Sequence, residues 1–181
     1  MSAPRACRRR KRLPRSRKCR SKSISDVPLD HLSDDIFDHG PDPDNPGWNH
    51  WNFHDDTLFN GAVLGRLIVR KDGDACRLRM FPERRHLNLQ GVIHGAVTMG
   101  LIDISLFSAM HVLGGSDSGP SVTLELSTQF VEAGKAEEPL DAVTSILRET
   151  GRLAFLRGEV VQGDTIVAAF SGIVRKFKPR S

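Results

Sequence analysis

One carboxylate, Asp103, lies in the middle of an otherwise uncharged and apolar stretch of the chain. From Ala96 to Met110 the sequence holds no Lys, Arg or Glu, which predicts a helix that is buried almost all round. An ionised carboxylate in apolar surroundings costs several kcal/mol unless it gains partners, so such a residue is a candidate for acid–base or nucleophilic chemistry. The alternative, which has equal weight, is a carboxylate with a purely structural role whose oxygens accept hydrogen bonds from backbone or hydroxyl donors.

Two glycines, Gly91 and Gly95, bracket His94 where this helix should begin. The first turn of a helix leaves backbone N–H groups without intrahelical partners, so the Gly95 N–H can receive an anionic oxygen. Asp103 follows Gly95 by eight residues, which is about 12 Å along a helix that rises about 1.5 Å per residue. A single carbonyl group cannot contact both, so joint action on one substrate requires the Asp103 of a second subunit in a two-fold dimer.

The stretch from Asn88 to Asp103, together with the later segment Ser-Val-Thr-Leu-Glu-Leu at 121–126, resembles the hotdog-fold acyl-CoA thioesterases of the phenylacetyl-CoA thioesterase group, also called PaaI-like. In that family an Asn, a His-Gly pair six residues later and an Asp eight residues after the Gly mark the active site, and this chain has the same spacing. The similarity covers roughly residues 58–177. Ala96 departs from the pattern, because the family usually has a second glycine there.

The resemblance implies a role for each residue of this motif. Asp103 is the general base or nucleophile, and the Gly95 N–H, aided by Asn88, holds the thioester carbonyl oxygen as negative charge develops on it. Thr123 corresponds to the Ser or Thr that positions the Asp or a water molecule, with an ordinary strand threonine as the alternative. His94 belongs to the motif, but a histidine beside a helix start more often holds backbone than transfers protons.

The candidate substrate-binding residues are Gly91, Ala96 and Arg152. Gly91 permits a close approach of a ligand, and the methyl group of Ala96 is expected to narrow the pocket. Arg152 is a candidate for contacting the coenzyme A phosphates across a dimer surface, as are Arg148 and Lys176. Charged residues at strand ends are usually only solvated, which is the alternative for all three.

Hydrolysis of acyl-CoA thioesters to a free acid and coenzyme A is therefore the predicted function. The chain has no Gly-x-Ser-x-Gly motif, no glycine-rich phosphate loop and no zinc-ligand spacing, so we expect a hydrolase that needs neither metal nor cofactor. One alternative is a hotdog dehydratase acting on hydroxyacyl thioesters, for which His94 would be the catalytic histidine. The other is a non-catalytic acyl-CoA sensor. The resemblance also implies a homodimer or a homotetramer.

The segments around the helix have the periodicity of strands. Alternating apolar residues on both sides of an Asp-Gly turn signal predict a hairpin over Leu67–Met80. Further strands are predicted at Val122–Phe130, Leu140–Glu149, Leu153–Val161 and Thr165–Lys176. This order indicates an α+β architecture in which an antiparallel sheet wraps around one long central helix, in agreement with the hotdog fold that the resemblance implies. Glu125 would share a strand face with Thr123, which makes it the alternative catalytic carboxylate to Asp103, the reserve carboxylate.

All of the net positive charge lies in the first 22 residues, which hold 11 Lys or Arg and no Asp or Glu. Runs of like charge usually stay disordered, so residues 1–26 are predicted to form a basic disordered tail with no part in the chemistry. A nucleic-acid-binding arm or a targeting address is the less favoured alternative. The tail lacks the apolar run of a secretory signal or a membrane anchor, and we expect a cytoplasmic protein.

Residues 27–60 mix acidic residues, Pro and Gly with aromatic residues. This composition predicts an irregular arm, with a short helix near Leu29–Phe37, whose aromatic side chains pack onto a hotdog domain at 61–181. His50, His54, Asp55 and Asp56 are types that bind metals, but no further ligand cluster follows, so solvated loop residues are expected. The central apolar run is shorter than the roughly 20 residues that a bilayer requires and carries Asp103, so no membrane span is expected.

Overall fold

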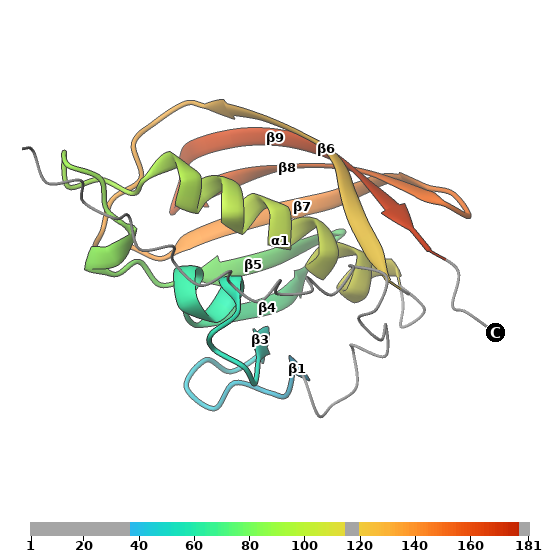
Figure 1. Ribbon diagram of the computed structural model, residues 1–181, viewed down its shortest axis with the longest axis horizontal. Coiled ribbons are helices and arrows are strands. Elements are labelled where there is room, and N and C mark those ends of the chain that lie inside the picture. The colour runs from blue at the N-terminus through green and yellow to red at the C-terminus, as the bar shows by residue number, and fades with distance from the viewer. Residues whose placement is uncertain (1–36, 115–119, 178–181) are drawn as a thin grey trace, which may run out of the picture.

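The computed structural model describes residues 37–114 and 120–177, which form a curved sheet around one long helix (Figure 1). Along the chain the elements are β1 (Phe37–Asp38), β2 (Asn49–His50), β3 (Asn52–Phe53), η2 (Asn60–Leu64), β4 (Leu67–Asp72), β5 (Ala75–Met80), η3 (Arg84–His86), α1 (Gly95–Gly114), β6 (Ser121–Phe130), β7 (Leu140–Glu149), β8 (Leu153–Gln162) and β9 (Thr165–Lys176). The short helix η2 is a π-helical turn and η3 is a 3-10 turn.

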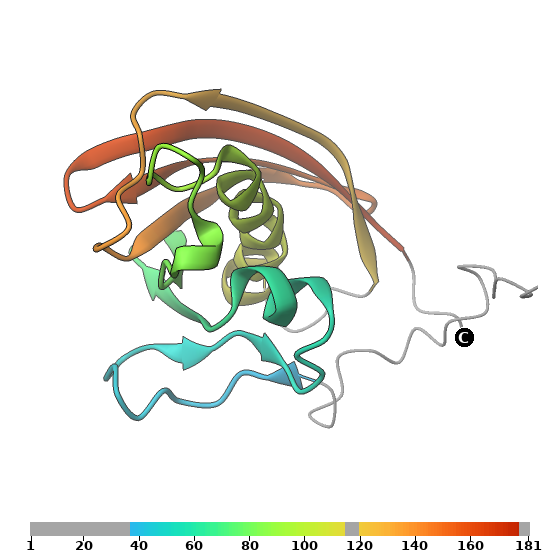
Figure 2. The ribbon, with the colours of Figure 1, turned by 60° about the vertical axis from the view of Figure 1, so that its left-hand side comes forward.

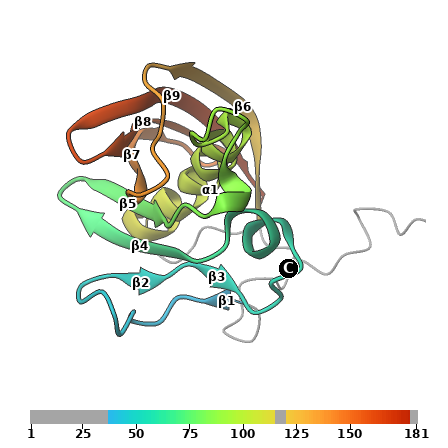
Figure 3. The same ribbon diagram turned by 90° about the vertical axis from the view of Figure 1, so that its left-hand side faces the viewer.

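Seven strands form one sheet in the order β2-β4-β5-β7-β8-β9-β6, and every neighbouring pair is antiparallel. The sheet curves around α1, which crosses its concave face (Figures 1 and 3). The predicted α+β hotdog architecture is therefore confirmed. β7 and β9 begin and end at the predicted residues, β6 begins one residue earlier, and β8 ends one residue later.

The central helix α1 supplies one side of the hydrophobic core. Leu101, Ile102 and Leu106 are fully buried, in a cluster with apolar side chains from the strands of the sheet. With 20 residues the helix is longer than the uncharged run, and by length and composition alone it would suffice to cross a membrane. Because 56% of its most apolar window is buried within the fold, we assign it as the core helix of a soluble fold.

One face of α1 is not covered by the sheet. Ala96 is exposed, Met99 is 43% exposed, and Gly100, Asp103 and Phe107 are half-buried. The prediction of a helix buried almost all round is wrong for this face. Apolar composition indicates that a helix face will be covered, but it does not tell whether the same chain provides the cover.

Strand β6 contains a bulge that changes which side chains face the helix. Thr123 pairs with buried Val174, whereas Glu125 pairs with the adjacent Ile173, so Leu124 is an extra residue in β6. Because directly paired residues point to the same side of a sheet, Thr123 faces α1 and Glu125 faces the opposite side. The expectation that the two share a face is therefore wrong, and Glu125 is not a reserve carboxylate for this site.

The arm before β4 is attached by its aromatic rings. Phe37 and Trp51 belong to the core cluster, with ring centroids 4.5 Å apart. The guanidinium groups of Arg70 and Arg79 each lie 4.6 Å from a Trp48 ring centroid. The predicted packing of the aromatic side chains onto the domain is confirmed at these positions.

The arm also contributes strands. β2 pairs with β4 at one edge of the main sheet, and β1 pairs with β3 in a small separate sheet, seen below the main sheet in Figures 2 and 3. The predicted basic tail lies outside the described residues, as does the predicted helix at Leu29–Phe37 apart from Phe37, which is in β1. The division into tail, arm and domain stays a prediction.

Candidate active site

The loop that leads into α1 is held by His86, which is only 1% exposed. Its Nδ1 accepts a hydrogen bond from the Glu83 N–H (2.8 Å), so the proton is on Nε2, which donates to the Val63 carbonyl oxygen (2.8 Å). The His86 carbonyl oxygen accepts a hydrogen bond from the His94 N–H (2.8 Å). His86 therefore ties the loop to η2 and determines where α1 begins.

Asn88 closes a tight turn within this loop. Its Oδ1 accepts hydrogen bonds from the Gln90 N–H (2.9 Å) and the Val92 N–H (3.3 Å). Gly91 completes the turn with φ +77°, a conformation that favours glycine, so the turn alone explains this residue. The Nδ2 group of Asn88 makes no hydrogen bond to another described residue, which leaves two donors for a carbonyl oxygen.

His94 caps the first turn of α1. Its Nδ1 accepts a hydrogen bond from the Ala96 N–H (3.0 Å), and its carbonyl oxygen accepts one from the Val97 N–H (2.9 Å). The side chain thus holds backbone, which leaves Nδ1 unavailable for proton transfer in a dehydratase. The N–H of Gly95, the residue directly after His94, makes no hydrogen bond to another described residue. It can therefore donate to an anionic oxygen.

Asp103 and Thr123 are brought together from α1 and β6. The Thr123 Oγ1 donates a hydrogen bond to the Asp103 Oδ1 over 2.6 Å. Asp103 lies half-buried on the uncovered face of α1, and its Oδ2 has no hydrogen-bond partner among the described residues. A carboxylate with one oxygen held and the other free can take a proton from water or attack a carbonyl carbon.

The remaining candidates lie at the two ends of α1. Gly95 is at the start of the helix, and Arg152 is in the β7–β8 turn near the other end. The Arg152 carbonyl oxygen accepts a hydrogen bond from the Lys176 N–H (2.8 Å), and the Lys176 ammonium group pairs with Glu149. A side chain built at Gly114, the last residue of α1, would contact that Glu149. Within one chain, Arg152 is therefore remote from Gly95.

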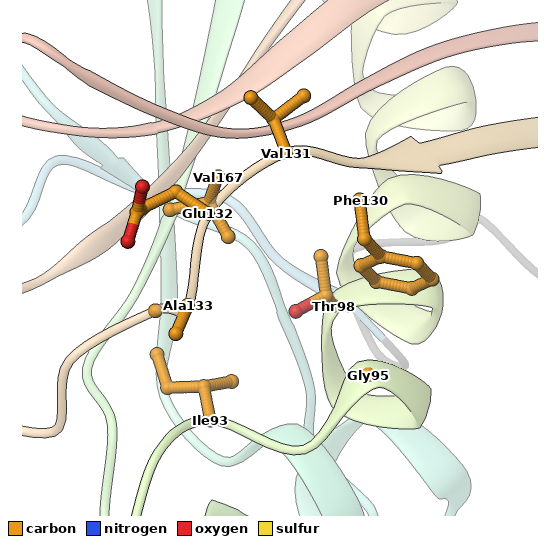
Figure 4. Close-up of a pocket in the computed structure, with 9 residues that line it drawn as sticks. Ile93, Gly95, Thr98, Phe130, Val131, Glu132, Ala133 and Val167 are labelled. Carbon is orange, nitrogen blue, oxygen red and sulfur yellow. The ribbon is translucent and has the colours of Figure 1, made fainter.

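A cavity of about 420 Å³ opens beside the start of α1 (Figure 4). Its lining residues are Ile93, Gly95, Thr98, Phe130, Val131, Glu132, Ala133, Gly134 and Val167. The Phe130 ring stands so close to Gly95 that a methyl group there would lie 3.3 Å from it. The oxyanion candidate thus borders an apolar cavity, and Ala96 contributes no side chain to its lining.

Among residues 37–114 and 120–177, no group of three or more His, Cys, Asp or Glu side chains is placed to hold a metal ion. His50 is not the solvated loop residue that we expected. It lies in β2, its Nδ1 is 2.9 Å from the Asp38 Oδ2, and its Nε2 is 3.4 Å from the buried Asp42 Oδ2. Pairing with two carboxylates of the same arm accounts for His50.

Three residues at this site were not identified from the sequence. His86 follows Glu83 by three residues, a spacing that could have indicated a capped turn. Thr98 is the sole polar side chain between Gly95 and Asp103 and lies one helical turn after Gly95. Phe130 approaches Gly95 only through the folding of β6 over the helix, so no local pattern indicates its role.

The family model of the thioesterase superfamily matches residues 90–169. A Pseudomonas aeruginosa protein named "Putative esterase PA0474" is 27% identical over 114 residues, which are 61% of this chain and 83% of that protein.

Two solved structures illustrate the similarity of the fold. Conserved protein PA5202 from Pseudomonas aeruginosa has a TM-score of 0.59 and 24% identity, over 68% of this chain and 98% of that one. A mutant form of the phenylacetic acid degradation protein PaaI from Thermus thermophilus has a TM-score of 0.56 and 25% identity, over 66% of this chain and 98% of that one.

Proposed function

We propose that the chain hydrolyses acyl-CoA thioesters to a free acid and coenzyme A, because it has the hotdog fold and the family model of the thioesterase superfamily matches residues 90–169. The observation that carries the proposal is the 2.6 Å hydrogen bond between Thr123 and Asp103. It orients a half-buried carboxylate on a helix face that is otherwise free of charge, and it leaves one carboxylate oxygen open to water or substrate. The relatives named as an esterase and as PaaI support the same chemistry.

The proposed reaction uses two hydrogen-bond donors and one carboxylate. The carbonyl oxygen of the thioester accepts hydrogen bonds from the Gly95 N–H and the Asn88 Nδ2, which stabilise the negative charge that develops on it. Asp103 takes a proton from a water molecule that attacks the carbonyl carbon, or its own oxygen attacks first and water then releases the acid. A C–O bond forms, the C–S bond breaks, and coenzyme A leaves as the thiolate, which takes up the proton.

A shared site explains why these groups are separated along one helix. We propose a homodimer or homotetramer in which Asp103 of the partner subunit faces Gly95 of the first, because a two-fold axis places two α1 helices antiparallel. The edge strand β6 supports this arrangement, since Val122 and Leu124 are exposed by 44% and 55%. Across the same axis, Arg152 of one subunit approaches the site of the other and is a candidate for contacting coenzyme A phosphates.

We propose that the enzyme works in the cytoplasm and needs no cofactor. Its one cysteine in the described domain, Cys76, is a buried free thiol. Burial raises the pKa of this thiol to about 12, although a hydrogen bond with Ser108 partly opposes the increase. Cys76 is therefore a poor nucleophile, so the hydrolysis depends on the carboxylate.

The test is the turnover of acyl-CoA by the wild type and by Asp103→Asn. This change keeps the shape of the side chain but removes the base, so we expect kcat to fall by about 100-fold or more with little change in KM. The matched control is Asp164→Asn, the same substitution at an exposed residue of the β8–β9 turn, which should leave kcat unchanged.

Near-normal kcat in folded Asp103→Asn, with Tm measured alongside, would contradict the role of Asp103. A wild-type protein that binds acyl-CoA but does not hydrolyse acetyl-, hexanoyl- or phenylacetyl-CoA would instead favour the sensor.

A further inference from the structure

The cavity beside Gly95 has a mostly apolar wall. Ile93, Val131 and Val167 surround it together with the Phe130 ring (Figure 4). The only charged side chain in its lining is that of Glu132, and a carboxylate repels anions. The phosphate groups of coenzyme A are therefore unsuited to this cavity, whereas an uncharged group of the substrate fits it.

Thr98 is the exception in this wall. The residue is only 2% exposed, yet its hydroxyl group makes no hydrogen bond to another described residue. Figure 4 shows the Thr98 hydroxyl directed away from the helix axis, toward the space between Ile93 and Ala133. A hydroxyl group that lines a cavity without a protein partner is left to bind water or a ligand, so a ligand with an oxygen at the right place can hydrogen-bond to it.

Gly95 and Thr98 are three residues apart in the first turn of α1. Residues three apart on a helix lie on the same face, with about 5–6 Å between their side-chain origins. A carbonyl oxygen held by the Gly95 N–H therefore places the first carbons of an acyl chain near the Thr98 hydroxyl. An oxygen on the third carbon of that chain would lie within its reach.

We propose that the acyl group enters this cavity and that Thr98 selects acyl groups with a hydroxyl or keto oxygen close to the thioester. The inference rests on the proposed function, because it takes the Gly95 N–H as the donor to the thioester carbonyl oxygen. Thr98 is then a specificity residue, and the Phe130 ring covers the thioester end of the chain.

The test compares three substrates of equal chain length: hexanoyl-CoA, 3-hydroxyhexanoyl-CoA and 3-oxohexanoyl-CoA. We expect wild-type kcat/KM to be about threefold to tenfold higher for at least one oxygenated substrate, as one neutral hydrogen bond allows. Thr98→Val has the same shape without the hydroxyl group and should bring the ratio close to one. Thr98→Ser keeps the hydroxyl group and should retain the preference.

The matched control is Thr128→Val. The Thr128 hydroxyl is buried without a partner among the described residues and lies outside the cavity lining, so the ratio should not change. A wild-type ratio of one, or an equal ratio in wild type and Thr98→Val, would overturn the proposal.

Binding measurements distinguish a failure of this inference from a failure of the proposed function. If the wild type hydrolyses none of the three substrates, the proposed function fails, and calorimetry with the stable thioethers S-hexyl-CoA and S-(3-hydroxyhexyl)-CoA then decides the inference. Tighter binding of the hydroxylated thioether, lost in Thr98→Val, supports the role of Thr98. Equal affinities in the wild type contradict it.

Discussion

At the scale of single residues, the hydrogen bond from Thr123 to Asp103 decides how the acid can act. The two side chains come from different elements, so the bond reports the packing of β6 against α1 rather than a property of either segment. It holds Oδ1 and leaves Oδ2 without a hydrogen-bond partner among the described residues. The two remaining donors of the site, the Asn88 Nδ2 and the Gly95 N–H, are left unpaired among the described residues in the same way, ready for a substrate.

Under the proposed function Thr123 is a positioning residue, and removing its hydroxyl group should affect turnover. We expect Thr123→Val to lower kcat by about tenfold, because loss of one hydrogen bond to a charged group costs about 1.5 kcal/mol or more. Thr123→Ser keeps the hydroxyl group and should recover most of the activity. Equal kcat values for the Val and Ser variants, at unchanged KM, would show that the hydrogen bond does not assist Asp103.

At the scale of elements, the site depends on parts of the chain that carry no catalytic group. The arm that contains β2 is joined to the body partly through Asp42, which is 3% exposed. Asp42 accepts hydrogen bonds from the backbone and side chain of Asn45 and pairs with Arg66. Burial by itself raises the pKa of Asp42, but the hydrogen bonds from Asn45 and Arg66 outweigh it and lower the pKa to about 2.

This lowered pKa predicts how the arm responds to acid. Because the folded-state pKa of about 2 lies below the usual 3.8, Asp42 contributes stability that is complete above pH 3.8 and is lost as the pH falls toward 2. We therefore expect the Tm difference between wild type and Asp42→Asn to be largest near pH 5 and to shrink by pH 2. Asp74→Asn, at an exposed carboxylate of the β4–β5 turn, is the control and should give a small difference at every pH. A constant difference for Asp42→Asn would rule out this role.

At the scale of the whole molecule, apolar surface gathers where a second subunit would lie. The uncovered face of α1, the edge strand β6 and the segment before η2 all expose large apolar side chains, among them Met99, Leu124 and Phe59. Phe59 lies against Gly100, one turn before Asp103, so this surface adjoins the acid. Exposed apolar surface of this kind marks an interaction site in soluble proteins.

A shared site predicts that two inactive proteins restore activity when their subunits exchange. Asp103→Ala removes the acid, and Asn88→Asp removes the Nδ2 donors while keeping an oxygen for the turn at Gln90 and Val92. In a mixed dimer one of the two sites has both native residues, so random exchange should recover at most about a quarter of wild-type activity. Activity that stays at the level of the separate variants, with exchange verified by mass spectrometry, would mean that each chain holds a complete site.

The sequence by itself determined the elements and the chemical motif of this protein. Alternation at a period of two and an uncharged run of helical length are local properties, so β7, β9 and most of α1 were predictable almost to the residue. The spacing of Gly95 and Asp103 was also sufficient to predict that one carbonyl group cannot contact both within one chain, because the rise of a helix is constant.

The tertiary structure alone decided which of these residues meet. The bulge at Leu124 turns Glu125 away from Thr123, because register depends on the partner strand and not on the pattern of β6 itself. The cavity exists because Phe130 and Val167 come from strands that follow the helix by many residues and fold back over its first turn. Whether a face of α1 is covered likewise depends on which other segments pack against it, so local periodicity carries no information about it.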